Sequence, residues 1–218
     1  MQLLAKFLSF VFHPIFIIIY SFYFYFNIEC FYNYLIQESA PDSYWVFLTL
    51  LIVMGVFFPI VSMLIMYRSK IITSFSIPNR KQRLPILILV VIYYSMTYYV
   101  FRHWNNNLFH LFEPFLTFLF GGVVSLVLAT IITFKWKISL HALAISGFSG
   151  GMLGILLISG EVYNLQEMMI YNTLLLLFMG LVSYSRLILK THTYAQVIAG
   201  IVLGFSIELS CVLFNISI

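Results

Sequence analysis

The sequence predicts an all-α, polytopic membrane protein: a helix bundle with about seven transmembrane helices in a single domain, residues 1–218. Hydrophobic residues make up 62% of the chain and charged residues only 8%, whereas a soluble domain carries roughly 25% charged residues. Apolar runs of about 20 residues, the length at which a helix crosses a bilayer, recur along the whole chain. The strands of a membrane β-barrel would be about half as long and would alternate in polarity, which these runs do not.

Polar connections divide the chain into the expected spans. The first run is too long and too aromatic for a cleavable signal peptide, and it is interpreted as a retained helix. The connections at 37–42, 68–83, 105–107, 135–137 and 160–161 are rich in charged residues, Asn, Gly or Pro, which favour turns. The predicted spans cover residues 8–34, 44–67, 84–102, 113–134, 139–159, 168–189 and 194–214.

The fifth span carries glycines at helical spacing. Gly147 with Gly151, and Gly150 with Gly154, are pairs four residues apart on one helix face. Small residues at this spacing let helix backbones approach closely in lipid, so the pattern predicts packing rather than chemistry. Glu208, inside the last span, would be costly facing lipid and is expected to face the bundle interior.

The charged residues sort to opposite ends of a seven-helix bundle. Every Lys and Arg except Arg102 falls at the end that receives the N-terminus, and the acidic residues fall in or toward the other end. The positive-inside rule would place the basic end in the cytoplasm. Most of these basic residues also belong to the candidate site at that end, so the sequence does not assign the side. They form short clusters between apolar runs, so nucleic acid is not expected as a partner.

Three polar clusters would meet at the basic end, at residues 78–85, 135–142 and 185–196. Convergent Arg and Lys side chains form an anion site, and the guanidinium fork suits phosphate oxygens. Histidines in the same place supply a nucleophile and a proton donor. Gln196 lies four residues after His192, on the same helix face. It can accept a hydrogen bond from one ring nitrogen and leave the other nitrogen free to attack.

This pattern resembles the type 2 phosphatidic acid phosphatase superfamily of membrane phosphatases. Ser185, Arg186 and His192 stand at the spacing of that family's third motif, Ser-Arg-x5-His-x3-Asp, with Gln196 at the position of the aspartate. The resemblance covers residues 78–205 and implies a phosphatase-like core there. The earlier spans add only general membrane character.

The second motif of that family, Pro-Ser-Gly-His, is matched in part. Ser139 and His141 stand in its serine and histidine positions, with Ile138 and Leu140 in place of the proline and the glycine. Leu140 crowds backbone that should approach the phosphate closely.

The first motif, Lys-x6-Arg-Pro, is the weakest match. Arg83 would be its arginine, although one residue separates it from Pro85. The lysine position holds Ser76, and Lys81 or Arg80 can take the role of that lysine.

The resemblance implies a phosphoric monoester hydrolase that acts on a lipid phosphate or diphosphate among the membrane lipids. His192 would be the nucleophile that forms a phosphohistidine, His141 would protonate the leaving alcohol, and Gln196 would orient His192. No metal or other cofactor would be needed, and the multi-pass chain would lie in the bacterial inner membrane. The phosphate would be held by Arg186, Arg83, Ser139, Lys81 and Lys137.

The departure at Gln196 keeps a second class of function open. A glutamine can orient the histidine but cannot neutralise its positive form, and its amide can be turned either way. In the serine protease triad the equivalent loss of charge lowers turnover by about 10⁴. The alternative is a non-catalytic relative that binds lipid phosphate, or a structural subunit of a membrane complex. The basic clusters could also serve only to orient the chain in the membrane.

The other histidines are not assigned to this site. His103 and His110, near Glu113, fit no strong metal-binding spacing and are expected to anchor the chain at the membrane interface. His13, directly before Pro14, is interpreted as structural.

Overall fold

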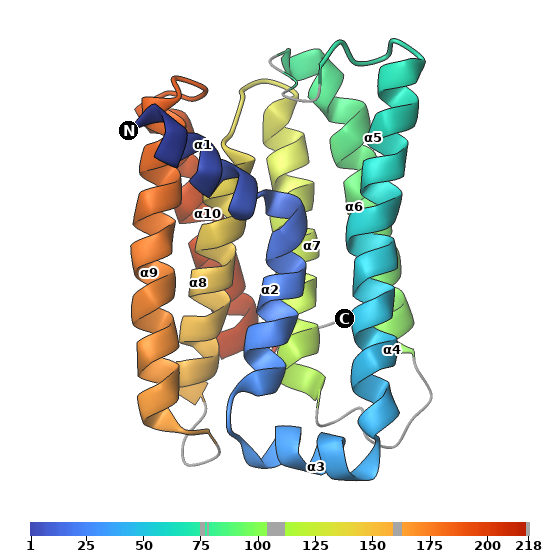
Figure 1. The fold of residues 1–218 in the computed structure, drawn as a ribbon, viewed down its shortest axis with the longest axis vertical. Coiled ribbons are helices and arrows are strands. Elements are labelled where there is room, and N and C mark those ends of the chain that lie inside the picture. The colour runs from blue at the N-terminus through green and yellow to red at the C-terminus, as the bar shows by residue number, and fades with distance from the viewer. Residues whose placement is uncertain (75–76, 78, 104–111, 159–162, 217–218) are drawn as a thin grey trace.

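The chain forms a bundle of long helices with its N-terminus at one end (Figure 1). The computed structural model describes residues 1–74, 77, 79–103, 112–158 and 163–216. Several predictions fall outside these described residues: those on the connections 105–107 and 160–161 and on Ser76, Pro78 and His110.

Helices account for most of the described chain. Among the described residues, six helical segments are long and apolar enough to cross a membrane, and a bent N-terminal pair makes a seventh if it counts as one span. The predicted all-α class and the count of about seven are therefore confirmed. The helices are α1 (Gln2–Val11), α2 (Pro14–Asn27), α3 (Phe31–Ser39), α4 (Pro41–Ile52), the π-helical turn η1 (Val53–Phe57), α5 (Phe58–Arg68), α6 (Arg80–Arg102), α7 (Glu113–Thr133), α8 (Leu140–Ile158), α9 (Leu165–Ile188) and α10 (Tyr194–Leu213).

The first predicted span is not one straight helix, because the chain bends by 62° between α1 and α2. Pro14 has no N–H to donate to a preceding turn, so it suits the first turn of a new helix. His13 caps that helix, and its Nδ1 accepts a hydrogen bond from the N–H of Ile15 at 3.4 Å. As a result α1 lies obliquely across the basic end while α2 descends into the bundle (Figure 1).

The first predicted span also ends earlier than expected. After α2 the chain turns, and α3 lies across the opposite end of the bundle (Figure 1). The side-chain amide of Asn33 donates to the carbonyl oxygens of Tyr25 at 2.7 Å and Ile28 at 2.9 Å. These are carbonyls that the end of a helix leaves without a partner, so Asn33 stabilises the turn.

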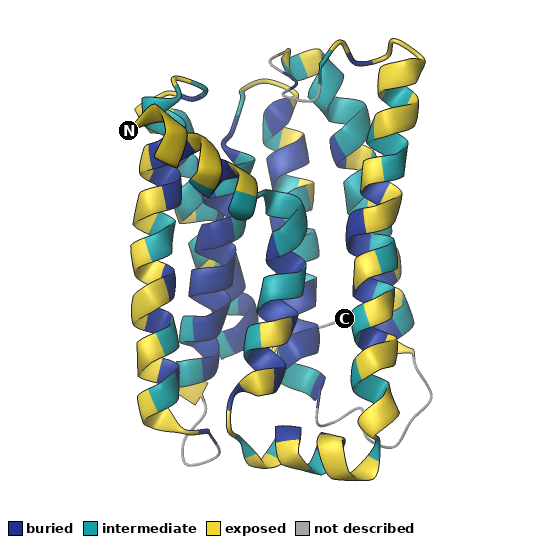
Figure 2. Cartoon of the chain, viewed as in Figure 1, coloured by how far each residue is buried: buried dark blue, intermediate teal, exposed yellow. Residues whose placement is uncertain are grey.

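α8 lies at the centre of the bundle and is largely buried, whereas the outer faces of α4 and α9 are exposed and apolar (Figure 2). The predicted glycine packing is confirmed. A Cβ on Gly150 would collide with the carbonyl of Phe205, and a Cβ on Gly154 would lie 2.9 Å from Val212, so both glycines face α10. Gly151 instead faces the ring of Phe118 on α7. The helices that carry the candidate site are thus held in backbone contact.

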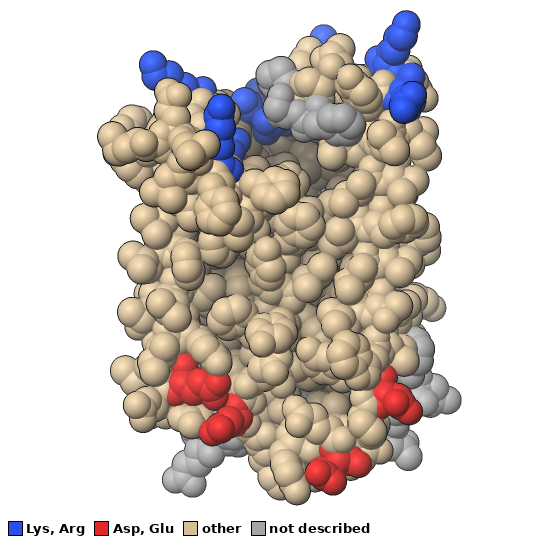
Figure 3. Space-filling model, in the orientation of Figure 1, with Lys and Arg blue, Asp and Glu red and all other residues tan. Residues whose placement is uncertain are grey.

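The charges separate along the bundle as the sequence predicts. On the face shown in Figure 3, Lys and Arg side chains gather at the end that holds the N-terminus, and Asp and Glu side chains gather at the other end. Glu208 belongs to neither end, since it is buried inside the bundle with 4% of its surface exposed. Its predicted inward orientation is confirmed.

Candidate functional site

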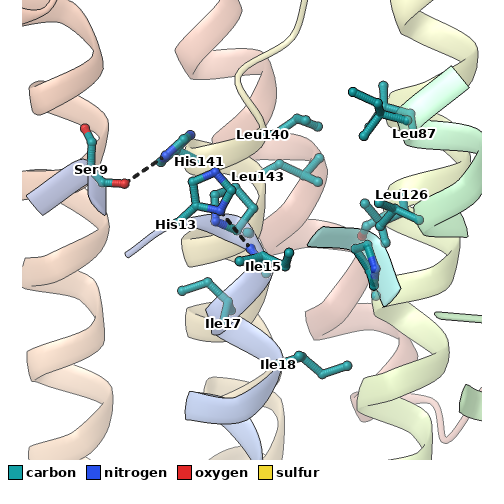
Figure 4. A pocket seen from close by; sticks show the side chains of 18 of the residues that line it. Ser9, His13, Ile15, Ile17, Ile18, Leu87, Leu126, Leu140, His141 and Leu143 are labelled. Carbon is teal, nitrogen blue, oxygen red and sulfur yellow. Dashed lines mark hydrogen bonds between the residues drawn. The ribbon is translucent and has the colours of Figure 1, made fainter. Parts of the chain in front are cut away.

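A cavity of about 770 Å³ runs from the basic end into the interior of the bundle. Its polar part is lined by side chains from α1, α6, α8, α9 and the connections that precede α8 and α10. The rest of the wall is largely apolar, with Ile17 and Ile18 of α2 on one side and Leu87 and Leu126 on the other (Figure 4). The cavity therefore has a cationic mouth and a hydrocarbon-like interior. Its volume lies within the range of ligand pockets.

The structure brings five of the eight predicted site residues to the wall of this cavity. The five are Arg83, Lys137, His141, Arg186 and His192. They come from three segments far apart in the sequence, which are the three clusters that were predicted to converge.

The other three predicted residues lie elsewhere. Lys81 is exposed on the first turn of α6 and does not line the cavity. Ser139 is fully buried, and its hydroxyl accepts a hydrogen bond from the N–H of Ala142 at 3.4 Å, at the start of α8. Ser139 thus caps a helix instead of facing the cavity. Gln196 does not line the cavity, and its contact with the site is its hydrogen bond to the ring of His192.

Gln196 fixes the ring of His192 through a capping box at the start of α10. The side-chain oxygen of Gln196 accepts hydrogen bonds from the N–H of Thr193 at 3.3 Å and from Nδ1 of His192 at 3.1 Å. The hydroxyl of Thr193 in turn accepts from the N–H of Gln196 at 3.4 Å. The backbone N–H of Thr193 can only donate, so the amide oxygen of Gln196 must face it, and the same oxygen then faces Nδ1 of His192. This hydrogen-bond network assigns the proton of His192 to Nδ1 and leaves the lone pair on Nε2.

His192 is held in its neutral, nucleophilic form. Burial, together with the positive charges of Lys137 and Arg83, lowers the pKa of His192 to about 3. The hydrogen bond from Nδ1 to Gln196 acts in the opposite direction and is the weaker influence. A neutral imidazole with a free Nε2 is the state required of a nitrogen nucleophile.

The three cations around His192 have only neutral hydrogen-bond partners among the described residues. Arg83 Nε donates to the carbonyl of Ile77 at 2.8 Å, and Lys137 Nζ donates to the carbonyl of Thr191 at 2.9 Å. Burial and the nearby charges of Arg83 and Arg186 lower the pKa of Lys137. Like charges gathered without a carboxylate favour the binding of an anion.

Arg186 is positioned by α1. Its Nη1 donates to the hydroxyl of Ser9 at 3.0 Å, and that hydroxyl lies 3.0 Å from the hydroxyl of Ser185. The Nε of Arg186 is buried and has no hydrogen-bond partner in the described part of the chain. One N–H donor of the guanidinium is therefore already paired within the protein, and other N–H donors remain available to a ligand.

His141 is also held by α1, in a way that the sequence did not indicate. Its Nε2 lies 3.1 Å from the carbonyl oxygen of Ser9, so Nε2 carries the proton and Nδ1 is left without one in the neutral ring. The ring of His13 packs edge-on at 5.2 Å between ring centres (Figure 4). Ser9 and His13 are thus residues of the site that sequence reasoning missed. The His13-Pro14 break within an apolar run was the available signal.

Within the described ranges, no group of three or more His, Cys, Asp or Glu side chains is arranged to hold a metal ion. His103 lies outside the cavity, with its ring stacked on Tyr99 at 4.1 Å between ring centres. The prediction that involved His110 lies outside the described residues.

No family model, curated protein or solved structure matches this chain. The guide to its function is therefore the geometry of the cavity. The mouth presents guanidinium and ammonium donors beside a neutral imidazole, and the interior presents hydrocarbon. This combination fits a molecule with an anionic head and an apolar tail.

Proposed function

We propose that this chain is a membrane phosphatase, similar to the type 2 phosphatidic acid phosphatases, that hydrolyses a lipid phosphate or diphosphate. The observation that carries the proposal is the position of neutral His192 among Arg83, Lys137 and Arg186 at the mouth of an apolar cavity. The cations would bind the phosphate group, and the apolar walls would contact the hydrocarbon chains of the lipid. The six or seven apolar spans suit a multi-pass protein of the bacterial inner membrane.

The reaction proceeds in two displacements. Nε2 of His192 attacks phosphorus, the bond between phosphorus and the lipid oxygen breaks, and a phosphohistidine forms. The leaving oxygen takes a proton from Nδ1 of His141, because the Nε2 proton is engaged with Ser9. The negative charge of the bound phosphate favours the doubly protonated ring that this step needs. Water then attacks phosphorus and passes a proton to the now neutral His141, the bond between phosphorus and Nε2 of His192 breaks, and inorganic phosphate leaves. The cations stabilise the charge on the phosphoryl oxygens in both transition states.

A second candidate is a non-catalytic protein that binds lipid phosphate, alone or as a subunit of a membrane complex. Two observations favour it. Gln196 supplies no negative charge to stabilise the imidazolium character that His192 gains during attack. Ser139 is engaged in capping α8 and does not line the cavity. Both candidates bind the same ligand, so only turnover separates them.

Phosphate release by the purified protein in detergent tests the proposal. The panel comprises phosphatidic acid, a polyprenyl phosphate and a polyprenyl diphosphate. Wild type is expected to release inorganic phosphate, and His192→Ala is expected to reduce release to the background rate because the nucleophile is lost. His103→Ala, an exposed histidine outside the cavity, is the matched control and should retain full activity.

Gln196→Asp decides between the two candidates. A carboxylate at this position would stabilise the positive charge on His192, and aspartate is also favourable in the first turn of a helix. We expect the substitution to raise phosphate release by about 10-fold or more, by the charge argument for the protease triad. If wild type and Gln196→Asp are both folded and both inert on every lipid tried, the non-catalytic candidate is correct.

A further inference from the structure

Two polar side chains in the inner part of the cavity each have an oxygen with no hydrogen-bond partner among the described residues. Ser125 of α7 and Glu208 of α10 both line the cavity, and each has 4% of its surface exposed. The Ser125 hydroxyl and Oε2 of Glu208 make no hydrogen bond with any described residue. An unsatisfied polar group inside a membrane is costly, and buried polar groups are normally paired. Two such side chains in the wall of one cavity make this part of the cavity a candidate site for a polar group of a ligand.

The carboxyl group of Glu208 lies in a space that three glycines create. A Cβ on Gly121 would collide with Oε2, and a Cβ on Gly147 would lie 3.1 Å from Cγ. Gly122, whose Cβ would lie 3.4 Å from Oε1, lines the cavity together with Gly147. Oε1 therefore lies at the cavity wall. An ionised carboxylate without a donor is very costly to bury, so this setting favours the neutral acid, which can donate its proton.

This pair lies deeper than the phosphate end of the cavity. Gly147 follows His141 by six residues on α8, which places it about 9 Å further along the helix axis. In a phosphorylated acyl lipid, the first polar groups beyond the phosphate are the ester or amide carbonyls, a few bonds away. In a polyprenyl phosphate the chain beyond the phosphate is hydrocarbon throughout. A ligand that satisfies both Ser125 and Glu208 must carry hydrogen-bond acceptors at this depth.

We propose that Ser125 and Glu208 form a carbonyl-binding subsite, through which the protein prefers phosphorylated acyl lipids to polyprenyl phosphates. The Ser125 hydroxyl and the neutral Glu208 carboxyl each donate a hydrogen bond to a carbonyl oxygen of the acyl linkage. The proposal rests on the proposed function for its phosphate end, because the cationic mouth sets the depth at which the linkage lies.

Binding of two matched lipids tests the subsite directly. Dialkylglycerol phosphate has the shape of diacylglycerol phosphate but lacks both carbonyls. Competition against a fluorescent lipid phosphate in detergent micelles gives the relative affinity without requiring turnover. Wild type should bind the diacyl lipid at least about 10-fold more tightly, because two buried hydrogen bonds form only with that lipid. The polyprenyl phosphate should bind as weakly as the dialkyl lipid.

Variants assign that preference to the two side chains. Ser125→Ala should reduce the preference for the diacyl lipid several-fold and leave dialkyl binding unchanged. Glu208→Gln retains a donor and should keep most of the preference, whereas Glu208→Met should reduce it. The matched control is Ser206→Ala, an exposed serine of α10 whose hydroxyl donates to the carbonyl of Val202, and it should keep the full preference. Ceramide phosphate distinguishes an amide from an ester source of the carbonyl.

The outcomes separate this proposal from the proposed function. Equal binding of diacyl and dialkyl lipids, or a preference that survives Ser125→Ala and Glu208→Met, overturns the subsite even if both lipids are hydrolysed. A diacyl preference that these variants remove supports the subsite even if no phosphate is released. Failure to bind any lipid phosphate overturns both.

Discussion

At the scale of single residues, the side-chain oxygen of Gln196 does two things at once. It closes the capping box that begins α10, and it holds the Nδ1 proton of His192. A freely turning amide could select either tautomer of the histidine. The N–H of Thr193 prevents that, because a turned amide would place its NH₂ group against this N–H, which can only donate. Glutamine therefore provides the orienting function of an aspartate here, without its charge.

The charges around His192 give a prediction about its titration. Lys137→Met removes a positive charge that disfavours protonation of the ring, so the pKa of His192 should rise from about 3, by about 1. Burial remains, so the pKa should stay below the usual value of about 6.5. NMR titration of the histidine ring protons in micelles measures this, with His192→Ala to assign the signal. Arg102→Met, at the other end of the bundle, should leave the pKa unchanged. A pKa that falls or stays fixed in Lys137→Met would contradict this account of the site.

The next scale is the helix, where backbone contact between α8 and α10 positions the site. Gly204 of α10 faces the first half of α8, and a Cβ there would overlap the carbonyl of Leu143 and lie 2.6 Å from the hydroxyl of Ser146. Without a hydrophobic driving force between helices in lipid, such close packing is a main source of association. His141 and His192 lie near the starts of these two helices, so their separation depends on this contact.

Gly204→Ala is therefore expected to force the two helices apart. Overpacking costs about 1–3 kcal/mol, which lowers the melting temperature of a chain of this size by about 2–12 °C. Gly180→Ala is the matched control, because nothing lies within 4 Å of a Cβ at that position of α9. Thermal unfolding in detergent should show a loss for Gly204→Ala and none for Gly180→Ala. Equal melting temperatures would show that the α8 and α10 backbones are not in tight contact.

At the scale of the whole molecule, the separation of charge gives the bundle one end that attracts anions. The mouth of the cavity lies at that end, and the acidic side chains visible in Figure 3 lie at the other. α1 crosses the basic end and contributes Ser9 and Lys6 to the cavity wall. An anion that binds at the mouth therefore contacts several segments together and should stabilise the bundle.

Orthovanadate or phosphate should accordingly raise the melting temperature of the wild-type protein. A ligand at 100 times its Kd stabilises the folded state by about 2.7 kcal/mol. Arg186→Met should remove most of this effect, whereas Arg102→Met, an exposed arginine of the acidic end, should retain it. An equal shift in both variants would mean that the anion binds elsewhere. Added salt should weaken the effect by screening.

The sequence predicted the spans and the convergence of basic residues because both follow from local composition and sidedness. It could not place Ser139, since whether a serine caps a helix or faces a cavity depends on where that helix begins. Nor could it reveal that Ser9 contacts Arg186 and His141, which requires the bend at His13. The Thr-x-x-Gln signature of the capping box was readable from the sequence, but its link to His192 depends on the loop before α10.

Because Gln196 has two roles, its retention among descendants of this protein would not show whether they are catalytic. A change at residue 196 that impaired the chemistry would also weaken the start of α10, so selection would retain the glutamine for either reason. A lineage that had abandoned hydrolysis would keep the Thr193 and Gln196 pair for folding alone. The more informative position is His192. Its described hydrogen bond joins it to another side chain and does not stabilise the backbone. If the proposed hydrolysis is correct, drift at that position among descendants would mark its loss, whereas persistence of Gln196 would not mark its survival.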